Sequence, residues 1–331
     1  MNKNDNLFKD KEVLITGGLG MIGSTIAKKL VRYNAKVTLL DSCIEPYGAN
    51  LFNIKSIRDK ITLNFSDIRD RESMKVLVRD KDIIFNLAGQ VSHNDSIENP
   101  YLDADINYLG HLNMLECVRK HNPGAIVLHA GSRLQFGKID YLPVDERHPQ
   151  KPRTPYALHK NAAENLYLYF FDIYGIRVVN FRIANPYGPR SQMKHSKYSM
   201  INWFIRLAME GKTIKVFGEG TQIRDYIYVD DLADAFLAAS VNDGCYGEAF
   251  NIGSGNGTKF IDMVAAIVAT VGKGEIEYVP WPDDYINVET GDYVASIKKI
   301  CDRTGWKPVI DLDAGIRSTF EYYKIHKNHY W

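Results

Sequence analysis

The sequence has 331 residues, of which 45% are hydrophobic and 24% charged, so it can fold around a large buried core. Its 41 lysines and arginines nearly balance its 40 aspartates and glutamates. A chain without a basic surplus lacks the charge of a nucleic-acid-binding or membrane-surface protein, and any anionic ligand must be held by local cations.

The first two thirds of the chain alternate between short apolar runs and longer stretches with helical spacing. We predict strands at Val13–Thr16, Lys36–Leu40, Ile61–Phe65, Ile83–Leu87, Ile126–His129 and Arg177–Ile183, and helices at Ile22–Tyr33, Asn107–His121 and Tyr156–Tyr174. The strands are apolar almost throughout, which is typical of a parallel sheet covered on both faces. This succession predicts an α/β protein with a Rossmann-type, doubly wound parallel sheet.

The texture of the sequence changes after Asn185. Residues 186–198 are rich in glycine, proline and polar side chains, and the elements that follow are short. We predict that residues 1–185 form the Rossmann domain, and that residues 186–331 mainly form a smaller α/β substrate domain interleaved with late elements of the first. The aromatic tail Phe320–Trp331 is expected to be a packed final helix.

The cysteines and the N-terminus bear on the compartment. The cysteines lie far apart, without the paired spacing of a zinc site or a disulfide framework: they are Cys43, Cys117, Cys245 and Cys301. The segment Met1–Lys11 is polar, and no uninterrupted apolar run approaches the roughly 20 residues of a membrane span. We therefore expect a cytoplasmic protein with no metal site and no membrane contact.

A glycine-rich loop joins the first strand to the first helix. The segment Gly17–Gly23 fits both G-x-G-x-x-G and G-x-x-G-x-x-G, and such loops let backbone N–H groups approach a pyrophosphate at a helix N-terminus. Glycines alone are also typical of structural turns. The second strand, however, ends at Asp41, about 20 residues later, where a carboxylate binds both ribose hydroxyls and repels a 2′-phosphate. The combination predicts NAD, rather than NADP, as cofactor.

Three further residues predict redox or acid–base chemistry. Tyr156 and Lys160 are one helical turn apart on one face of a predicted helix. A neighbouring ammonium favours the phenolate, so we expect Lys160 to lower the pKa of Tyr156 from about 10. Such a pair by itself is typical of a solvated helix surface. Ser132, however, follows the strand Ile126–His129 at the carboxyl edge of the sheet, where ligands of this fold bind.

Seven ordered motifs, spread over nearly the whole chain, resemble those of NDP-sugar epimerases and dehydratases of the extended short-chain dehydrogenase/reductase family, UDP-glucose 4-epimerase-like members included. The motifs are Thr16–Gly23, Ser66–Arg69, Asn86–Gly89, Asp105–Asn107, Tyr156 with Lys160, Asn185–Gly188 and Arg224–Tyr226. The resemblance implies an NAD-dependent enzyme that acts on a nucleotide-diphosphate sugar. It also implies a homodimer formed through the helices Asp105–Lys120 and Tyr156–Tyr174.

The residues and the resemblance together assign the site. Cofactor-binding residues are Gly17, Gly20, Met21, Ile22, Asp41, Ser42, Asp67, Ile68, Leu87, Ala88, Gly89, Asn107, Tyr156 and Lys160; substrate-binding residues are His93, Ser132, Asn185, Arg190 and Arg224; catalytic residues are Ser132, Tyr156 and Lys160. Each has a plainer alternative. Arg224 could pair with Asp225 or Asp230 at the surface, His93 could be a core or exposed histidine, and Asn107 could be only a buried polar support.

Departures from the family pattern bear on the reaction. Arg133 and Leu134 stand where 4,6-dehydratases carry an Asp-Glu pair, and Glu289 or Thr290 stands where the family has a second arginine for the diphosphate; Phe136 replaces a tyrosine. Without the acids, the sequence favours epimerisation, at C4, through a transient 4-keto sugar. The alternatives are a net 4-dehydrogenase, a 4-ketosugar reductase, a dehydratase with a displaced acid, and a non-catalytic NAD-sensing module.

Overall fold

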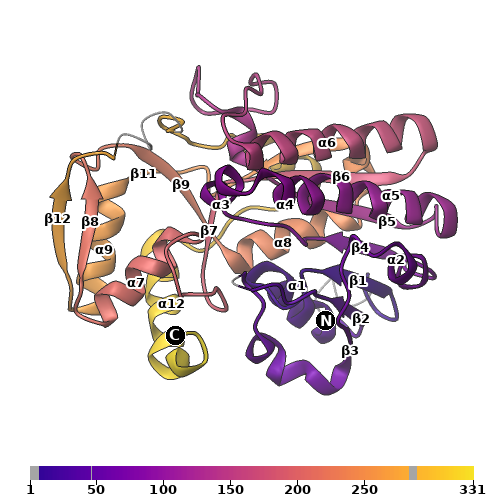
Figure 1. The fold of residues 1–331 in the computed structure, drawn as a ribbon, viewed down its shortest axis with the longest axis horizontal. Coiled ribbons are helices and arrows are strands. Elements are labelled where there is room, and N and C mark those ends of the chain that lie inside the picture. The colour runs from indigo at the N-terminus through magenta and orange to yellow at the C-terminus, as the bar shows by residue number, and fades with distance from the viewer. Residues whose placement is uncertain (1–6, 46, 283–288) are drawn as a thin grey trace.

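The computed structural model describes residues 7–45, 47–282 and 289–331 (Figure 1). Within these residues the largest sheet has seven strands, all parallel, in the order β10-β6-β5-β4-β1-β2-β3. The strands are β1 (Glu12–Thr16), β2 (Lys36–Leu40), β3 (Ile61–Asn64), β4 (Ile83–Asn86), β5 (Ile126–Ser132), β6 (Arg177–Ile183) and β10 (Glu248–Ile252). The prediction of a doubly wound parallel sheet is confirmed.

Helices cover both faces of this sheet (Figure 1). One face carries α2 (Arg71–Leu77), α5 (Gly110–His121) and α6 (Pro155–Tyr174), and the other carries α1 (Met21–Arg32), α8 (Val229–Ser240) and α11 (Lys298–Thr304). In β1, Val13 and Ile15 pack on the α1 side, whereas Leu14 packs on the α5 side. Because both sets of side chains are buried, the strands are apolar almost without interruption.

A smaller set of elements packs against the carboxyl edge of the sheet. It comprises the helices α7 (Met200–Met209), α9 (Phe260–Val271) and α12 (Leu312–His326), the sheet of β7 (Asn185–Tyr187), β9 (Ile223–Tyr228) and β11 (Gly257–Lys259), and the pair β8 (Thr213–Phe217) and β12 (Glu275–Val279). These elements enclose their own apolar cluster. Three later elements belong to the large sheet instead: β10 is one of its edge strands, and α8 and α11 pack on one of its faces.

Short elements complete the part of the chain that the structure describes. They are α3 (His93–Glu98), α4 (Pro100–Ala104), a π-helical turn at Asp105–Leu109, and 3-10 helices at Leu51–Lys60, Arg133–Phe136, Asp243–Cys245 and Lys327–His329. No helix in the described ranges has both the length and the apolar character of a bilayer span.

Most boundaries lie within one residue of the predictions, but three elements differ by three residues or more. The strand expected to end at His129 continues to Ser132, because Ala130–Ser132 pair with Phe181–Ile183 of β6. The helix expected from Asn107 begins with the π turn and becomes regular only at Gly110. The final helix ends at His326 rather than Trp331, although Tyr330 beyond it is buried against the same cluster.

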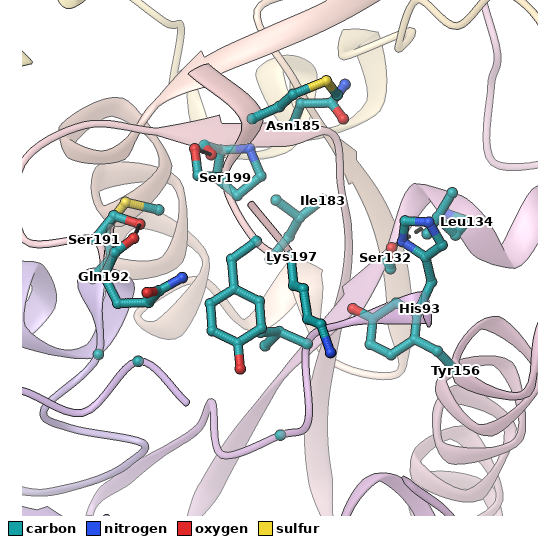
Figure 2. Close-up of a pocket in the computed structure, with 18 of the residues that line it drawn as sticks. His93, Ser132, Leu134, Tyr156, Ile183, Asn185, Ser191, Gln192, Lys197 and Ser199 are labelled. Carbon is teal, nitrogen blue, oxygen red and sulfur yellow. Dashed lines mark hydrogen bonds between the residues drawn. The ribbon is translucent and has the colours of Figure 1, made fainter. Parts of the chain in front are cut away.

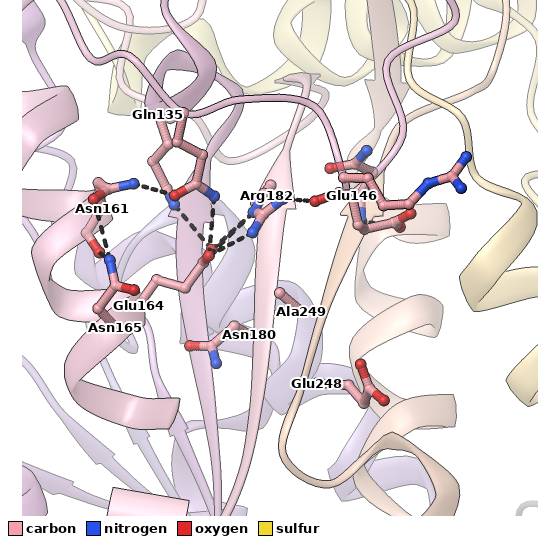
Figure 3. Close-up of polar contacts among 12 residues, drawn as sticks. Gln135, Glu146, Asn161, Glu164, Asn165, Asn180, Arg182, Glu248 and Ala249 are labelled. Atoms are coloured by element: carbon pink, nitrogen blue, oxygen red, sulfur yellow. Dashed lines mark hydrogen bonds and ion pairs between the residues drawn. The ribbon is translucent and has the colours of Figure 1, made fainter. Parts of the chain in front are cut away.

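The helix α6 is held in place by its ends and by one buried ion pair. Thr154 caps its first turn, Pro155 occupies the first helical position, and Gly175 ends it in the left-handed conformation. In its middle, the carboxylate of Glu164 accepts from Nε and Nη2 of Arg182 on β6, with the closest contact at 2.6 Å (Figure 3). Both side chains are almost completely buried.

We predict that Glu164→Gln lowers the free energy of unfolding by about 3–5 kcal/mol at neutral pH, because it leaves the Arg182 guanidinium buried without a counter-charge. Burial raises the pKa of Glu164, but its bonds to Arg182 outweigh burial and hold the pKa below its usual value. The stabilisation is therefore present above the unfolded pKa of about 4.3 and is lost as the pH falls through the lower folded value.

Urea unfolding at several pH values measures this difference. The difference between wild type and Glu164→Gln should shrink below about pH 4. The control is Glu321→Gln, which removes an exposed pair with Lys324 and should cost less than about 1 kcal/mol. Equal losses for the two variants would contradict the role of the buried pair.

Candidate active site

A cavity of about 750 Å³ lies along the carboxyl edge of the large sheet (Figure 2). It runs from the glycine loop after β1 to Arg224 on β9. Every residue that the sequence assigns to the site lines it, except Asn107 and Arg190. The loops that follow parallel strands thus meet at one place, as expected for this class of sheet.

Arg190 needs correction. Its side chain is buried and its Nη2 donates to Oγ1 of Thr25 on α1 at 2.9 Å, while Asp230 lies 4.0 Å away. Arg190 therefore links the segment after β7 to α1 and does not line the cavity, so its prediction as a substrate-binding residue is not supported.

The glycine loop leaves room for a ligand only because it lacks side chains. Gly17 has φ +64°, and a Cβ there would come within 3.0 Å of the backbone of Leu87 and Ala88. A Cβ on Gly23 would lie 2.4 Å from the carbonyl oxygen of Gly17, so glycine is required for the loop to pack on its helix. Backbone N–H groups and the N-terminus of α1 are the groups this loop offers, and they suit a pyrophosphate.

Asp41 closes the same end of the cavity. Its carboxylate accepts from the backbone N–H groups of Leu19 and Cys43, each at 3.0 Å, which fixes it at the end of β2. Burial raises the pKa of Asp41, and these two bonds oppose the rise. Ser42, Asp67 and Ile68 line the wall beside it. The backbone cradle and the fixed carboxylate together fit the diphosphate and ribose of NAD.

The three predicted catalytic residues all line the cavity, and Figure 2 shows Ser132 and Tyr156 close together on one side of it. Burial raises the pKa of Tyr156 to about 12, partly offset by a hydrogen bond with the side chain of Ser132. Burial also lowers the pKa of Lys160 to about 8. The expectation that Lys160 lowers the pKa of Tyr156 is therefore not confirmed, since burial dominates and Nζ of Lys160 is tied to the carbonyl of Ala130 at 3.0 Å.

A buried polar group lies behind Lys160. The amide nitrogen of Asn107 donates to the carbonyl of Gln90 and to Asp103, each at 2.9 Å, and Asp103 also bonds Nδ1 of His159 at 2.5 Å. The amide oxygen of Asn107 has no partner among the described residues. Asn107 thus supports the site from below rather than lining it, which agrees with the alternative of a buried polar support.

Arg224 and His93 lie toward the substrate end. Arg224 is 5% exposed and donates to Glu289 at 2.5 Å and to the carbonyls of Ile223 and Gly291. The alternative that Arg224 pairs with Asp225 or Asp230 at the surface is therefore wrong, because its ion-pair partner is Glu289. Figure 2 shows His93 on the same side of the cavity as Ser132 and Tyr156. Burial, followed by the charge of Arg133, lowers the pKa of His93, which keeps its imidazole neutral at physiological pH.

Comparison with known proteins agrees with this geometry. The model of the NAD-dependent epimerase/dehydratase family matches residues 13–253. The chain belongs to this family. A relative from Methanocaldococcus jannaschii is 35% identical, with 94% of this chain and 98% of the relative covered. A UDP-glucose 4-epimerase of Mycolicibacterium smegmatis is 30% identical over the same shares of the two chains. The predicted enzyme class and NAD dependence are confirmed by this membership.

Solved structures show the same fold over the whole length. The structure of a UDP-glucose 4-epimerase from Thermotoga maritima with UDP-glucose has a TM-score of 0.88, at 27% identity, and covers 96% of this chain and 99% of its own.

Sequence reasoning missed several residues of this family member's site. Gln135 accepts from the backbone N–H of Ser132 at 2.8 Å and donates to Glu164 at 2.9 Å, and so connects Ser132 to the buried ion pair. Asp103 and His159 support Asn107. The spacing of Glu164 from Lys160, one helical turn, was a visible sign that both lie on one side of α6.

We predict that Asp41→Asn narrows the preference for NAD over NADP about tenfold or more, because it removes a negative charge that faces a 2′-phosphate. Calorimetric titration of both dinucleotides gives the ratio of their dissociation constants. Asp59→Asn, an exposed site outside the cavity, should leave the ratio unchanged. An unchanged ratio in Asp41→Asn would show that Asp41 does not meet the ribose.

Proposed function

We propose that the chain is an NAD-dependent nucleotide-sugar 4-epimerase that acts through a transient 4-keto sugar. The observation that carries the proposal is the meeting of Ser132, Tyr156 and Lys160 in one cavity, with a dinucleotide cradle at one end and Arg224 at the other. The side chains that follow Ser132 are Arg133 and Leu134, which cannot donate a proton to a departing hydroxyl. This pattern favours epimerisation over dehydration.

In this mechanism the phenol of Tyr156, as phenolate, removes the proton of the sugar 4-hydroxyl. Ser132 bonds the same oxygen and holds it as the carbonyl forms. The charge of Lys160 holds the cofactor ribose beside the phenol. Because burial disfavours the phenolate, a positive charge is needed near Tyr156. The nicotinamide ring of bound NAD would supply that charge and would accept the hydride from C4. After the keto sugar has turned and the hydride is back at C4 from the other face, Tyr156 returns the proton to the 4-oxygen, which gives the epimeric alcohol.

The decisive experiment follows nucleotide sugars by mass spectrometry and NMR while the NADH absorbance is recorded. Purified protein is incubated with UDP-, GDP-, CDP- and dTDP-hexoses. We expect an isomer of equal mass and no net change in NADH. A product lighter by two hydrogens would instead show a dehydrogenase, and a product lighter by water would show a dehydratase.

We predict that Tyr156→Phe lowers kcat by a factor of roughly 10²–10⁴, the usual contribution of a general acid–base group. NAD binding should persist, because the aromatic ring remains. Tyr278→Phe, at an exposed tyrosine of the small domain, serves as the matched control and should turn over normally. Full activity of Tyr156→Phe would remove the phenol from the mechanism.

We also propose a homodimer through α5 and α6. Leu158, Tyr169 and Ile173 of α6 are exposed. Tyr169 and Ile173 follow Leu158 by 11 and 15 residues, which is close to a whole number of helical turns, so the three side chains lie on one face of the helix. Leu109 is exposed just before α5. A stripe of large apolar side chains on a solvent-facing helix is typical of a protein–protein interface, and a second copy of this chain presents the same stripe.

We predict that Ile173→Asp converts the dimer to a monomer, because it places a charge in the apolar interface. Light scattering coupled to gel filtration measures the mass. Tyr278→Asp, which changes an exposed tyrosine away from α6, should leave the mass unchanged. A monomeric wild type would contradict the assembly.

A further inference from the structure

Arg133 lies in the cavity wall directly after Ser132, and its guanidinium is held by neutral groups. Nε donates to the amide oxygen of Asn185 at 3.3 Å, and Nη1 donates to Oγ1 of Thr290 at 3.1 Å. The guanidinium carbon also stands 5.3 Å from the centre of the Tyr293 ring. These contacts come from β7 and from the segment 290–293, so the orientation of the guanidinium is fixed from two sides.

The charges around Arg133 do not balance. Arg224 has its counter-ion, Glu289, whereas no described carboxylate lies within ion-pair distance of Arg133. Burial, and then the charge of Arg224, lower the pKa of Arg133 to about 10, so the group is still charged at neutral pH. Arg133 is half-buried, and a guanidinium that is withdrawn from water without an anion carries a cost in free energy. A ligand that brings negative oxygens into the cavity removes that cost.

The same three-residue segment joins the two arginines. Thr290 accepts from Arg133, while its neighbours Glu289 and Gly291 accept from Arg224. The two guanidiniums therefore contact one short segment and lie near each other, and Arg133 is the one that follows Ser132 directly in the chain. A planar fork at this point matches the paired oxygens of a phosphate or of a carboxylate.

We propose that Arg133 is an anion-binding residue of the substrate site, which holds negative oxygens of the nucleotide sugar on the reacting side of Arg224. The inference rests on the proposed function, since it assumes that a nucleotide-diphosphate sugar occupies this cavity. The oxygens come either from the diphosphate or from a carboxylate on the sugar ring. In the second case Arg133 selects nucleotide uronic acids over neutral hexoses.

The test measures dissociation constants of the NAD-loaded enzyme for UDP, UDP-glucose and UDP-glucuronate by calorimetry. Arg133→Met removes the charge but keeps most of the stem, and Arg133→Lys keeps the charge but removes the fork. If Arg133 holds the diphosphate, Arg133→Met weakens all three ligands by about 10- to 100-fold. If it holds a sugar carboxylate, only UDP-glucuronate weakens by this factor. Arg133→Lys should restore part of either loss.

Controls separate binding from folding and from catalysis. Arg317→Met, at an exposed arginine of α12, should bind all ligands as wild type does, and the NAD affinity and melting temperature of Arg133→Met should stay close to those of wild type. Unchanged dissociation constants for all three ligands in Arg133→Met would overturn the inference. So would a wild type that binds none of the diphosphates of uridine, guanosine, cytidine and thymidine.

The outcomes for the two proposals are distinguishable. An enzyme that isomerises nucleotide sugars but binds them equally well without Arg133 retains the proposed function and loses this inference. An enzyme whose nucleotide binding depends on Arg133, but which isomerises no nucleotide sugar, retains the inference and loses the proposed function.

Discussion

The buried ion pair between Glu164 and Arg182 connects the parts of the site that must keep a fixed distance. Glu164 lies on α6, eight residues after Tyr156 and four after Lys160, so all three share one helix. Arg182 lies on β6, opposite Gly131 of β5. Gln135 donates to Glu164 (Figure 3) and accepts from the backbone N–H of Ser132. One carboxylate thus ties the helix that carries the phenol and the ammonium to the strand end that carries the hydroxyl.

This rigidity has an electrostatic consequence. The burial that fixes Tyr156 and Lys160 raises the pKa of Tyr156 to about 12, so its phenol is neutral in the protein alone, and lowers that of Lys160 to about 8, so its ammonium still carries most of its charge at neutral pH. The phenolate form of Tyr156 therefore depends on a positive charge that enters the cavity with a ligand. The end of the cavity near Arg224 also has unbalanced charge, because Arg133 and Arg224 together carry more positive charge than Glu289 offsets. At both ends of the cavity, therefore, a bound ligand would supply the charge that the protein alone lacks.

Much of this was predictable from local sequence, and the rest depends on contacts between distant residues. Strands β2 and β6 fall where apolar runs predict them, and the glycine loop and Asp41 lie where their spacing places them. The end of β5 was missed because the side chains of Ala130–Ser132 are small and do not continue the apolar run, and their strand character comes from pairing with β6. The sequence showed only that Arg133 stands where dehydratases carry an acid. Its contact with Thr290 could not be read from the sequence, because the two residues are 157 positions apart. Arg190 was misplaced because nothing local reveals its bond to α1.

We propose that oxidation and reduction at C4 occur within one bound complex. The most direct measurement uses a nucleotide hexose that carries deuterium at C4, converted by the enzyme in ordinary water and analysed by NMR and mass spectrometry. We expect the isomer to keep its deuterium at C4, because the hydrogen removed is the hydrogen returned. Loss of the label from C4, or an isomer formed only with stoichiometric consumption of added NAD, would contradict the account.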